Sequence, residues 1–167
     1  MNTNKKIKVV LIDDSALIRE RVESALSCLE GVEVAGQAGD VSAGLQLLQE
    51  HQPDVLLLDI DMPGETGIDL LQSGKVQRES LLIIMLTNYD HPKLRERCLE
   101  LGAKYFFHKL TEIEQAIETC RETAARRVRP VTELERLGAR VEALLEECGS
   151  RLNDIQAKLR RKLPNAG

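Results

Sequence analysis

The stretch that decides the fold is DVLLLDIDMPG, residues 54–64, in which four consecutive apolar residues run directly into acidic ones. Continuous apolar runs of this kind are typical of parallel strands that are buried on both faces. Because carboxylates oppose burial, Asp59 and Asp61 are expected at and just beyond the end of such a strand. Pro63 and Gly64 then stop the strand and favour a loop. The stretch therefore predicts a buried strand whose carboxyl end is acidic.

Similar apolar runs recur along the chain and alternate with helical patterns. We predict strands at residues 7–13, 32–38, 55–59, 81–87 and 104–108, and helices at residues 15–29, 41–51, 68–72, 92–101 and 112–127. This alternation predicts a parallel sheet with helices on both faces and right-handed crossovers. The expected fold class is α/β, a doubly wound, five-stranded, flavodoxin-like sheet of order 2-1-3-4-5. Ligands of such sheets bind at the carboxyl ends of the strands.

Length and charge divide the chain into two parts. With 167 residues it is long enough for one well-buried domain and an appendage. Residues 1–120 carry 12 basic and 20 acidic residues, whereas residues 121–167 carry 11 basic and 7 acidic ones, which together give the net charge of −4. The segment VRPV interrupts the last helix of the domain. We therefore predict an α/β domain at residues 1–127 and a helical extension at residues 128–167.

Composition and local pattern argue against several classes of protein. No run of 18 apolar residues occurs, so a membrane span is not expected. The apolar run near the start is only VVLI and two acids follow it, which predicts a first strand and not a signal peptide. The four cysteines are widely spaced and form no CxxC motif, which favours reduced thiols. We therefore expect a cytoplasmic protein.

Polar side chains stand at the carboxyl ends of four predicted strands. They are Asp13 and Asp14 after the first strand, Asp59 at the end of the third, Thr87 at the end of the fourth and Lys109 after the fifth. Alone, the Asp13–Asp14 pair also fits a helix N-cap and Lys109 fits a solvated lysine. Because the carboxyl ends of parallel strands meet at one edge, the combination favours a site.

The acidic residues at this edge predict a metal site. Three carboxylates close together repel one another in a partly desolvated pocket, and a hard divalent cation relieves that repulsion. Mg²⁺ suits a shallow site with oxygen ligands that keeps some of its waters. We predict that Asp13, Asp14 and Asp59 hold Mg²⁺ and that the backbone carbonyl of Asp61 completes the shell. The Pro63–Gly64 turn lets the loop wrap around the ion.

The same edge predicts phosphoryl chemistry. A carboxylate beside Mg²⁺ can attack a phosphoryl group and form an aspartyl phosphate. Asp59 is the best nucleophile because its strand is central in the sheet. Lys109 and the Thr87 hydroxyl are then expected to hold phosphoryl oxygens.

The segments that carry these residues resemble the receiver domain of two-component response regulators. The segments are DD at 13–14, LLLDIDMPGETG around 59, MLTN around 87 and GAKYFFHK ending at 109. The resemblance covers about residues 5–122 and holds in both order and spacing. It implies that Asp59 accepts a phosphoryl group from a sensor histidine kinase or a phosphotransfer protein, and that the chain is a switch and not an enzyme.

The resemblance assigns further roles. It implies that Thr87 and Phe106 form a switch that reports phosphorylation on the surface of the fourth helix, fifth strand and fifth helix, although Phe106 also fits a plain core position. Tyr89 and Asp61 stand where this family tunes dephosphorylation. Leu110 stands where many members have a proline after a cis bond, and a leucine there predicts a trans bond.

A second family shares part of the pattern. The Asp59-x-Asp61 pair after an apolar strand also resembles the haloacid-dehalogenase phosphatases, in which the second Asp is the general acid. Those proteins usually carry the pair near the chain start and further acids after the lysine. Here an acidic pair comes first, and only Glu112 and Glu114 follow the lysine closely. A short motif outside its structural context is weak, so this alternative is less favoured.

The extension carries a heptad-like apolar seam. Its positions are Leu134, Leu137, Val141, Leu144, Cys148, Leu152, Ile155, Leu159 and Leu163. Steps of three and four residues, with a stutter after Cys148, are typical of a coiled coil. A homodimer through residues 131–163 is the first choice, and a hairpin that turns at residues 148–150 or a helix of a partner protein remains open.

The basic clusters of the extension leave a second kind of output open. The basic clusters RRVR, residues 126–129, and KLRRK, residues 158–162, are compatible with nucleic-acid binding by a transcription regulator, but glutamates elsewhere in the extension favour a solvated helix face. Nucleic acid is therefore not the favoured partner. We expect a stand-alone response regulator that signals through protein–protein contacts with a target that the sequence does not name.

Overall fold

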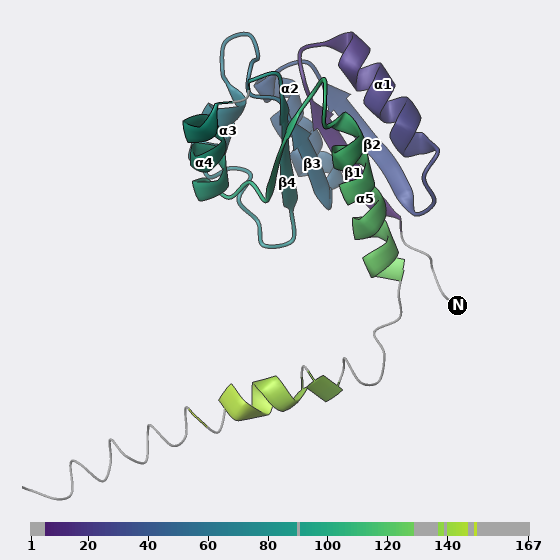
Figure 1. The fold of residues 1–167 in the computed structure, drawn as a ribbon, viewed down its shortest axis with the longest axis vertical. Coiled ribbons are helices and arrows are strands. Elements are labelled where there is room, and N and C mark those ends of the chain that lie inside the picture. The colour runs from purple at the N-terminus through teal and green to yellow at the C-terminus, as the bar shows by residue number, and fades with distance from the viewer. Residues whose placement is uncertain (1–5, 90, 129–136, 139, 147–148, 150–167) are drawn as a thin grey trace, which may run out of the picture. The chain divides into compact units, whose positions relative to one another are not determined.

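The computed structural model describes residues 6–89, 91–128, 137–138, 140–146 and 149 (Figure 1). The chain divides into two compact units, Met1–Val128 and Arg129–Gly167.

The first unit contains a single five-stranded sheet among its described residues. The strands are β1 (Ile7–Ile12), β2 (Val32–Ala38), β3 (Val55–Leu58), β4 (Leu82–Thr87) and β5 (Tyr105–His108). The helices are α1 (Ala16–Ser27), α2 (Val41–His51), α3 (Gly67–Gln72), α4 (Pro92–Glu100) and α5 (Ile113–Val128). All neighbouring strands are parallel and their order is β2-β1-β3-β4-β5, so the predicted fold class is confirmed.

The predicted elements differ from the observed ones only at their ends. The first and third strands end one residue earlier than predicted, at Ile12 and Leu58, although the backbone N–H of the aspartate that follows each one still donates to a neighbouring strand. The first helix ends at Ser27 and not near residue 29, and the other bounds shift by a residue at most. Element ends are the least regular parts of helices and strands, and such shifts leave the architecture unchanged.

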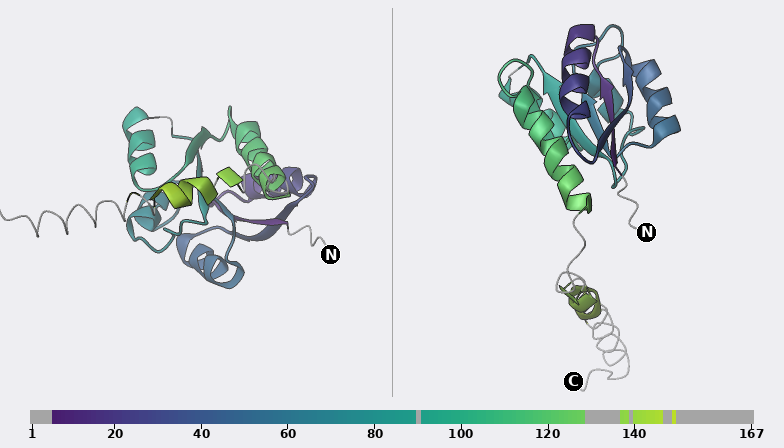
Figure 2. Two further views of the ribbon diagram at one scale, coloured as in Figure 1. Left: turned by 90° about the horizontal axis from the view of Figure 1, so that it is seen from below. Right: turned by 90° about the vertical axis from the view of Figure 1, so that its right-hand side faces the viewer.

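Two hydrophobic cores lie on the two faces of the sheet. Helices α1 and α5 cover one face, whereas α2, α3 and α4 cover the other (Figures 1 and 2). Successive residues of β1 point to opposite cores, with Val10 and Ile12 in one and Val9 and Leu11 in the other. This double burial explains why the central strands read as continuous apolar runs.

Three cysteines belong to the described residues, and all three are free thiols. Cys98 and Cys120 lie in the two cores, where burial raises their pKa to about 11 and about 12. Cys28 is exposed, and Cys148 lies outside the described residues. The buried thiols therefore act as small core side chains with little thiolate character.

The second unit is described only in part. Residues 137–138, 140–146 and 149 are helical, and Leu137, Val141 and Leu144 of the predicted seam are more than half exposed in this single chain. The remaining seam positions lie outside the described residues. In the part of the chain that the structure describes, no helix is both long enough and apolar enough to cross a membrane.

The start of α3 packs directly against the backbone that follows β3. Thr66 caps this helix, accepting a hydrogen bond from the Asp69 backbone N–H, while the Asp69 carboxylate accepts one from the Thr66 N–H. Gly67 comes next and is buried, and its backbone N–H donates to the carbonyl of Ile60 at 3.0 Å. A Cβ atom on Gly67 would lie 2.0 Å from the carbonyl oxygen of Asp59. Only glycine allows this approach, which fixes the loop after Asp59 against α3.

Replacement of Gly67 by alanine is expected to destabilise the fold. The added methyl group meets backbone atoms, which cannot rotate away, and overpacking of this kind costs about 1–3 kcal/mol. Gly39→Ala is the matched control, because a Cβ there meets only the Arg19 side chain at an ordinary 3.4 Å. Urea unfolding of both variants tests the prediction, and equal midpoints for the two would contradict it.

Candidate functional site

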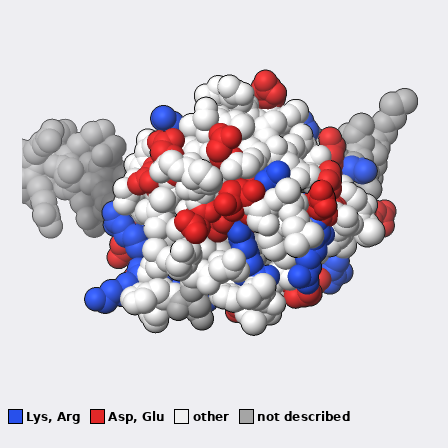
Figure 3. All heavy atoms as spheres, turned by 90° about the horizontal axis from the view of Figure 1, so that it is seen from above, with Lys and Arg blue, Asp and Glu red and all other residues white. Residues whose placement is uncertain are grey.

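The buried polar side chains of the described chain gather at the carboxyl edge of the sheet. Asp13, Asp59, Thr87 and Lys109 are the only polar or charged residues that are buried in the part of the molecule that the structure describes. All four were predicted from the strand ends, and each comes from a different strand end. Figure 3 looks down on this edge and shows acidic side chains near the middle of the face.

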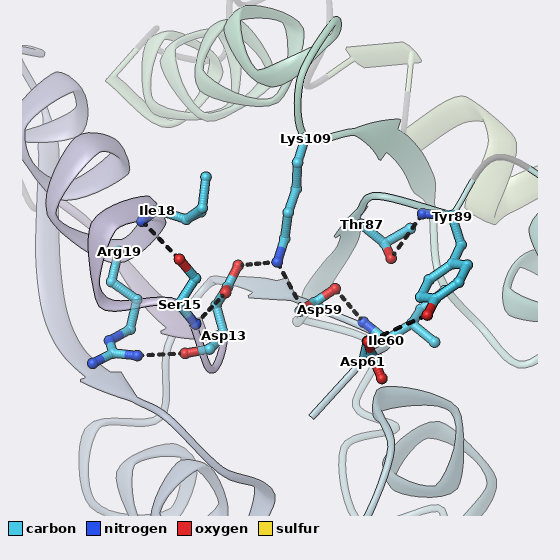
Figure 4. Close-up of polar contacts among 10 residues, drawn as sticks. All are labelled: Asp13, Ser15, Ile18, Arg19, Asp59, Ile60, Asp61, Thr87, Tyr89 and Lys109. Atoms are coloured by element: carbon cyan, nitrogen blue, oxygen red, sulfur yellow. Dashed lines mark hydrogen bonds and ion pairs between the residues drawn. The ribbon is translucent and has the colours of Figure 1, made fainter. Parts of the chain in front are cut away.

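Lys109 lies between two of the aspartates (Figure 4). Its Nζ is 2.6 Å from Asp59 Oδ2 and 2.7 Å from Asp13 Oδ2. The end of β4 holds the lysine in place, because the backbone N–H of Lys109 donates to the carbonyl of Thr87, the last residue of β4, at 2.9 Å. Removing one member of a buried ion pair leaves an uncompensated charge. The three side chains therefore form one electrostatic unit.

Burial and pairing act in opposite directions on the pKa values of this unit. Burial raises the pKa of Asp13, and this effect outweighs the opposing hydrogen bond and charge of Lys109. Burial lowers the pKa of Lys109, but its hydrogen bonds to Asp13 and Asp59 and the charges of both carboxylates more than offset that effect. The net pKa of Lys109 is raised, so the lysine carries its positive charge between the two acids.

Backbone N–H groups bind the Oδ1 atoms of the two buried carboxyl groups, and one arginine binds the main chain beside them. Asp13 Oδ1 accepts a hydrogen bond from the Ser15 backbone N–H at 2.9 Å, and Asp59 Oδ1 accepts one from the Ile60 N–H at 2.7 Å. Arg19 Nη1 donates to the backbone carbonyl of Asp13 at 2.6 Å. Each carboxyl group therefore keeps its other oxygen, Oδ2, toward Lys109 (Figure 4).

The carboxylates at this edge suit a hard cation. One carboxylate oxygen from each of Asp13, Asp14 and Asp59 lies within 4.8 Å of the others, and Asp14 is exposed to solvent. This donor set contains only oxygen, which is what Mg²⁺ prefers in proteins. Asp61, the fourth predicted contributor, lines the adjoining pocket, and its side chain accepts a hydrogen bond from Tyr89 Oη at 3.3 Å.

A pocket opens from the carboxylates toward solvent. Its lining residues are Asp14, Ser15, Ile18, Asp59, Asp61, Asn88, Tyr89 and Lys109. Both Asp59 and Lys109 border this space although each is almost entirely buried. A small anionic group that enters the pocket therefore meets a carboxylate and an ammonium group side by side.

The two predicted switch residues lie in different surroundings. The Thr87 hydroxyl is buried and accepts a hydrogen bond from the Tyr89 N–H at 3.4 Å. Phe106 is 3% exposed and belongs to the core under α2, α3 and α4. The backbone has no cis peptide bond among the described residues, so the bond between Lys109 and Leu110 is trans, as expected.

Two arginines that support the site were not predicted. Arg19 binds the carbonyl of Asp13, and Arg95 packs its guanidinium over the Phe106 ring at 4.8 Å from the centroid. Arg19 follows the capping residue Ser15 by one helical turn, which is a signal that sequence reasoning can use. Arg95 reaches β5 from α4, and only the tertiary fold reveals that contact.

The chain is similar to known proteins across the first unit. The family model for the response regulator receiver domain matches residues 9–121. A protein of Mycobacterium tuberculosis named "Probable transcriptional regulatory protein NarL" is 36% identical over 119 residues, which cover 70% of this chain and 55% of that protein. A protein-glutamate methylesterase/protein-glutamine glutaminase of Geobacter sulfurreducens is 36% identical over 135 residues, which cover 80% of this chain and 36% of that protein.

A solved structure agrees with this similarity. The signal receiver domain of NarL from Mycobacterium tuberculosis matches with a TM-score of 0.65 and 32% identity, and the match covers 72% of this chain and 98% of that domain. The chain thus spans about half or less of the length of the two curated relatives and nearly all of the solved domain.

Replacement of Lys109 by glutamine is expected to make the fold depend on a divalent cation. Loss of the ammonium group leaves Asp13 and Asp59 buried without a counter-ion, which costs about 3–5 kcal/mol in comparable pairs. Mg²⁺ should then raise the melting temperature of the variant more than that of the wild type, because it no longer competes with the lysine.

Thermal melts with and without Mg²⁺ test this prediction. Lys104→Gln is the matched control, because Lys104 is exposed and lies just before β5. An equal Mg²⁺ shift in the wild type and in Lys109→Gln would show that the lysine does not compete with the cation for Asp13 and Asp59.

Proposed function

Because the chain belongs to the family of response regulator receiver domains, we propose that it is a phosphorylation-activated signalling switch whose phosphoryl acceptor is Asp59. Its first unit is the receiver domain of a two-component response regulator. The observation that carries the proposal is the buried Asp13–Lys109–Asp59 unit, which opens into a polar pocket. The proposed phosphoryl donor is a sensor histidine kinase or a phosphotransfer protein.

The proposed reaction is a displacement at phosphorus. A carboxylate oxygen of Asp59 attacks the phosphorus atom of a phosphohistidine, and the bond between phosphorus and the imidazole nitrogen breaks. The nitrogen keeps the electron pair of that bond, and Asp59 becomes an acyl phosphate. Hydrogen bonds from Ile60 N–H and Lys109 Nζ orient the carboxylate before the attack. Such fixed orientation lowers the barrier by positioning the nucleophile.

Mg²⁺ is the cofactor that fits the acidic group. Asp13, Asp14 and Asp59 would hold it, and their oxygen-only donor set and mutual proximity support this assignment. The ion, when bound, neutralises charge on the oxygens of the transferred phosphoryl group. A contribution from the backbone carbonyl of Asp61 remains part of the proposal.

Lys109 is proposed to bind the phosphoryl group after transfer. Its Nζ already contacts the nucleophile at 2.6 Å, so a phosphoryl oxygen on Asp59 would lie within reach. The ammonium group would then exchange a contact with Asp13 for one with the phosphoryl group, which carries more negative charge. We further propose that the Thr87 hydroxyl, which accepts a hydrogen bond from the Tyr89 N–H, donates its own proton to another phosphoryl oxygen.

The output is proposed to be protein–protein contact. Thr87 and Phe106 are the proposed switch, which would change the surface of α4, β5 and α5. The names of the relatives, a transcriptional regulator and a methylesterase, belong to proteins that are much longer than their matched parts. A direct role in transcription is the second candidate, and the similarity to NarL is the observation that favours it. DNA binding that weakens steeply with salt would support that candidate.

The second unit is proposed to pair with a second copy of the chain. Leu137, Val141 and Leu144 follow the heptad-like spacing, and their helical segments expose them in the single chain. Exposed apolar side chains that repeat along one helix face mark an interaction site in soluble proteins. The hairpin and the partner helix remain the other candidates for covering them.

The role of Asp59 is tested by phosphorylation with a small acyl phosphate. Wild-type protein should gain the mass of one phosphoryl group only when Mg²⁺ is present, and Asp59→Asn should gain none, because an amide oxygen is a poor nucleophile. Glu65→Gln, an exposed change in the same loop, is the control and should be phosphorylated normally. Persistent labelling of Asp59→Asn at another residue would refute the assignment.

Self-association of the second unit is tested by two neighbouring substitutions. Leu144→Asp should lower the sedimenting mass, because a charge on the seam opposes close packing. Leu145→Asp is the matched control, since Leu145 is 66% exposed but lies off the seam. A wild-type protein that sediments as a monomer at high micromolar concentration would rule out self-pairing.

A further inference from the structure

Arg95 of α4 contacts β5 and the loop after it through three interactions. Its guanidinium lies over the Phe106 ring at 4.8 Å from the centroid, and its Nη1 donates to the Phe106 backbone carbonyl at 2.9 Å. Its Nη2 lies 3.8 Å from Glu112 Oε2. One side chain thus holds both the ring and the backbone of a residue in the edge strand.

These contacts enclose the segment that carries Lys109. Phe106 comes three residues before the lysine and Glu112 comes three residues after it. Glu112 Oε2 also accepts a hydrogen bond from the His108 backbone N–H at 2.8 Å. On its inner side the same segment is tied to the sheet by Lys109 Nζ, which binds Asp13 and Asp59. Residues 106–112 are therefore held by α4 on one side and by the buried aspartates on the other.

The combined contact with the ring and the backbone of Phe106 requires an arginine. A planar guanidinium can stack on an aromatic face and donate a hydrogen bond in its own plane at the same time, which a lysine ammonium cannot do. The contact to the Phe106 carbonyl is charge-assisted and acts on the backbone of β5 itself. The ion pair to Glu112 is longer and about a third exposed, so it contributes less.

We propose that Arg95 is a positioning residue that holds residues 106–112 in the arrangement of the unphosphorylated protein. This inference rests on the proposed function, in which a phosphoryl group on Asp59 draws Lys109 away from Asp13. Such a shift moves the end of β5, and the contacts of Arg95 to Phe106 and Glu112 resist it. By linkage, a change that removes those contacts favours the phosphorylated arrangement. Phosphorylation in turn weakens the contacts of Arg95 by the same coupling free energy.

The test compares Arg95→Ala with Arg97→Ala. Both arginines lie on α4, but the Arg97 side chain pairs with Glu100 of its own helix and not with β5 or the loop after it. Beryllofluoride with Mg²⁺ serves as the phosphoryl mimic. Arg95→Ala should bind it about fivefold or more tightly than the wild type, which is the lower end of usual coupling factors. Arg97→Ala should bind it as the wild type does.

Fluorine NMR reports on the arrangement directly. The chain has two phenylalanines, so fluorophenylalanine labelling gives two signals, and Phe107→Tyr identifies that of Phe106. Before any beryllofluoride is added, the Phe106 signal of Arg95→Ala should lie nearer to its bound position than that of the wild type. A role in stability alone would lower the unfolding midpoint without this displacement.

Two milder variants keep the proposal testable if Arg95→Ala does not fold. Arg95→Lys keeps the charge but loses the planar stack, and Glu112→Gln loses the ion pair but keeps an acceptor for His108 N–H; both should tighten binding less than Arg95→Ala. Variants that bind the mimic as the wild type does, or more weakly, would overturn the role of Arg95. A wild type that does not respond to the mimic would overturn the proposed function as well.

Discussion

The burial of one lysine between two aspartates is the constraint on which the site depends. Lys109 follows the edge strand β5 and reaches past the end of β4 to Asp59 and Asp13, and all three residues are at most 5% exposed. Charges at such positions are tolerated only when they compensate one another. The sheet order brings the ends of β1, β3 and β5 to one edge, so the fold and the charge balance of the site require each other.

The local pattern of the sequence was enough to predict the fold and the convergence of the site residues. The apolar run before Asp59 identified a strand that is buried on both faces and therefore a parallel sheet. Because the carboxyl ends of parallel strands lie at the same edge, the polar residues at the strand ends were expected to meet there. The contacts within the site were beyond that reasoning. Whether Lys109 pairs with Asp13, Asp59 or solvent depends on side-chain geometry, and the reach of Arg95 from α4 to β5 depends on tertiary packing.

In the extension, the sequence predicts an apolar seam but does not predict what covers it. Its seam is visible as a repeat of leucines and similar residues, but a repeat does not specify which surface covers it. Only Leu137, Val141 and Leu144 of the seam are described, and in a single chain they face solvent. The spacing of apolar residues is a property of one chain, whereas a partner surface is a property of two.

The contact between Gly67 and the carbonyl of Asp59 has a consequence for the direction of any rearrangement. On the α3 side, the backbone of Gly67 packs against the carbonyl of Asp59 and leaves no room for a methyl group. The loop after Asp59 therefore cannot move toward α3. Beyond β4 lies β5, a strand of four residues at the edge of the sheet, which pairs with β4 on one side only. Under the proposed function, charge added at Asp59 would be blocked on the α3 side. The resulting displacement would then pass toward β5, the strand with a single partner in the sheet.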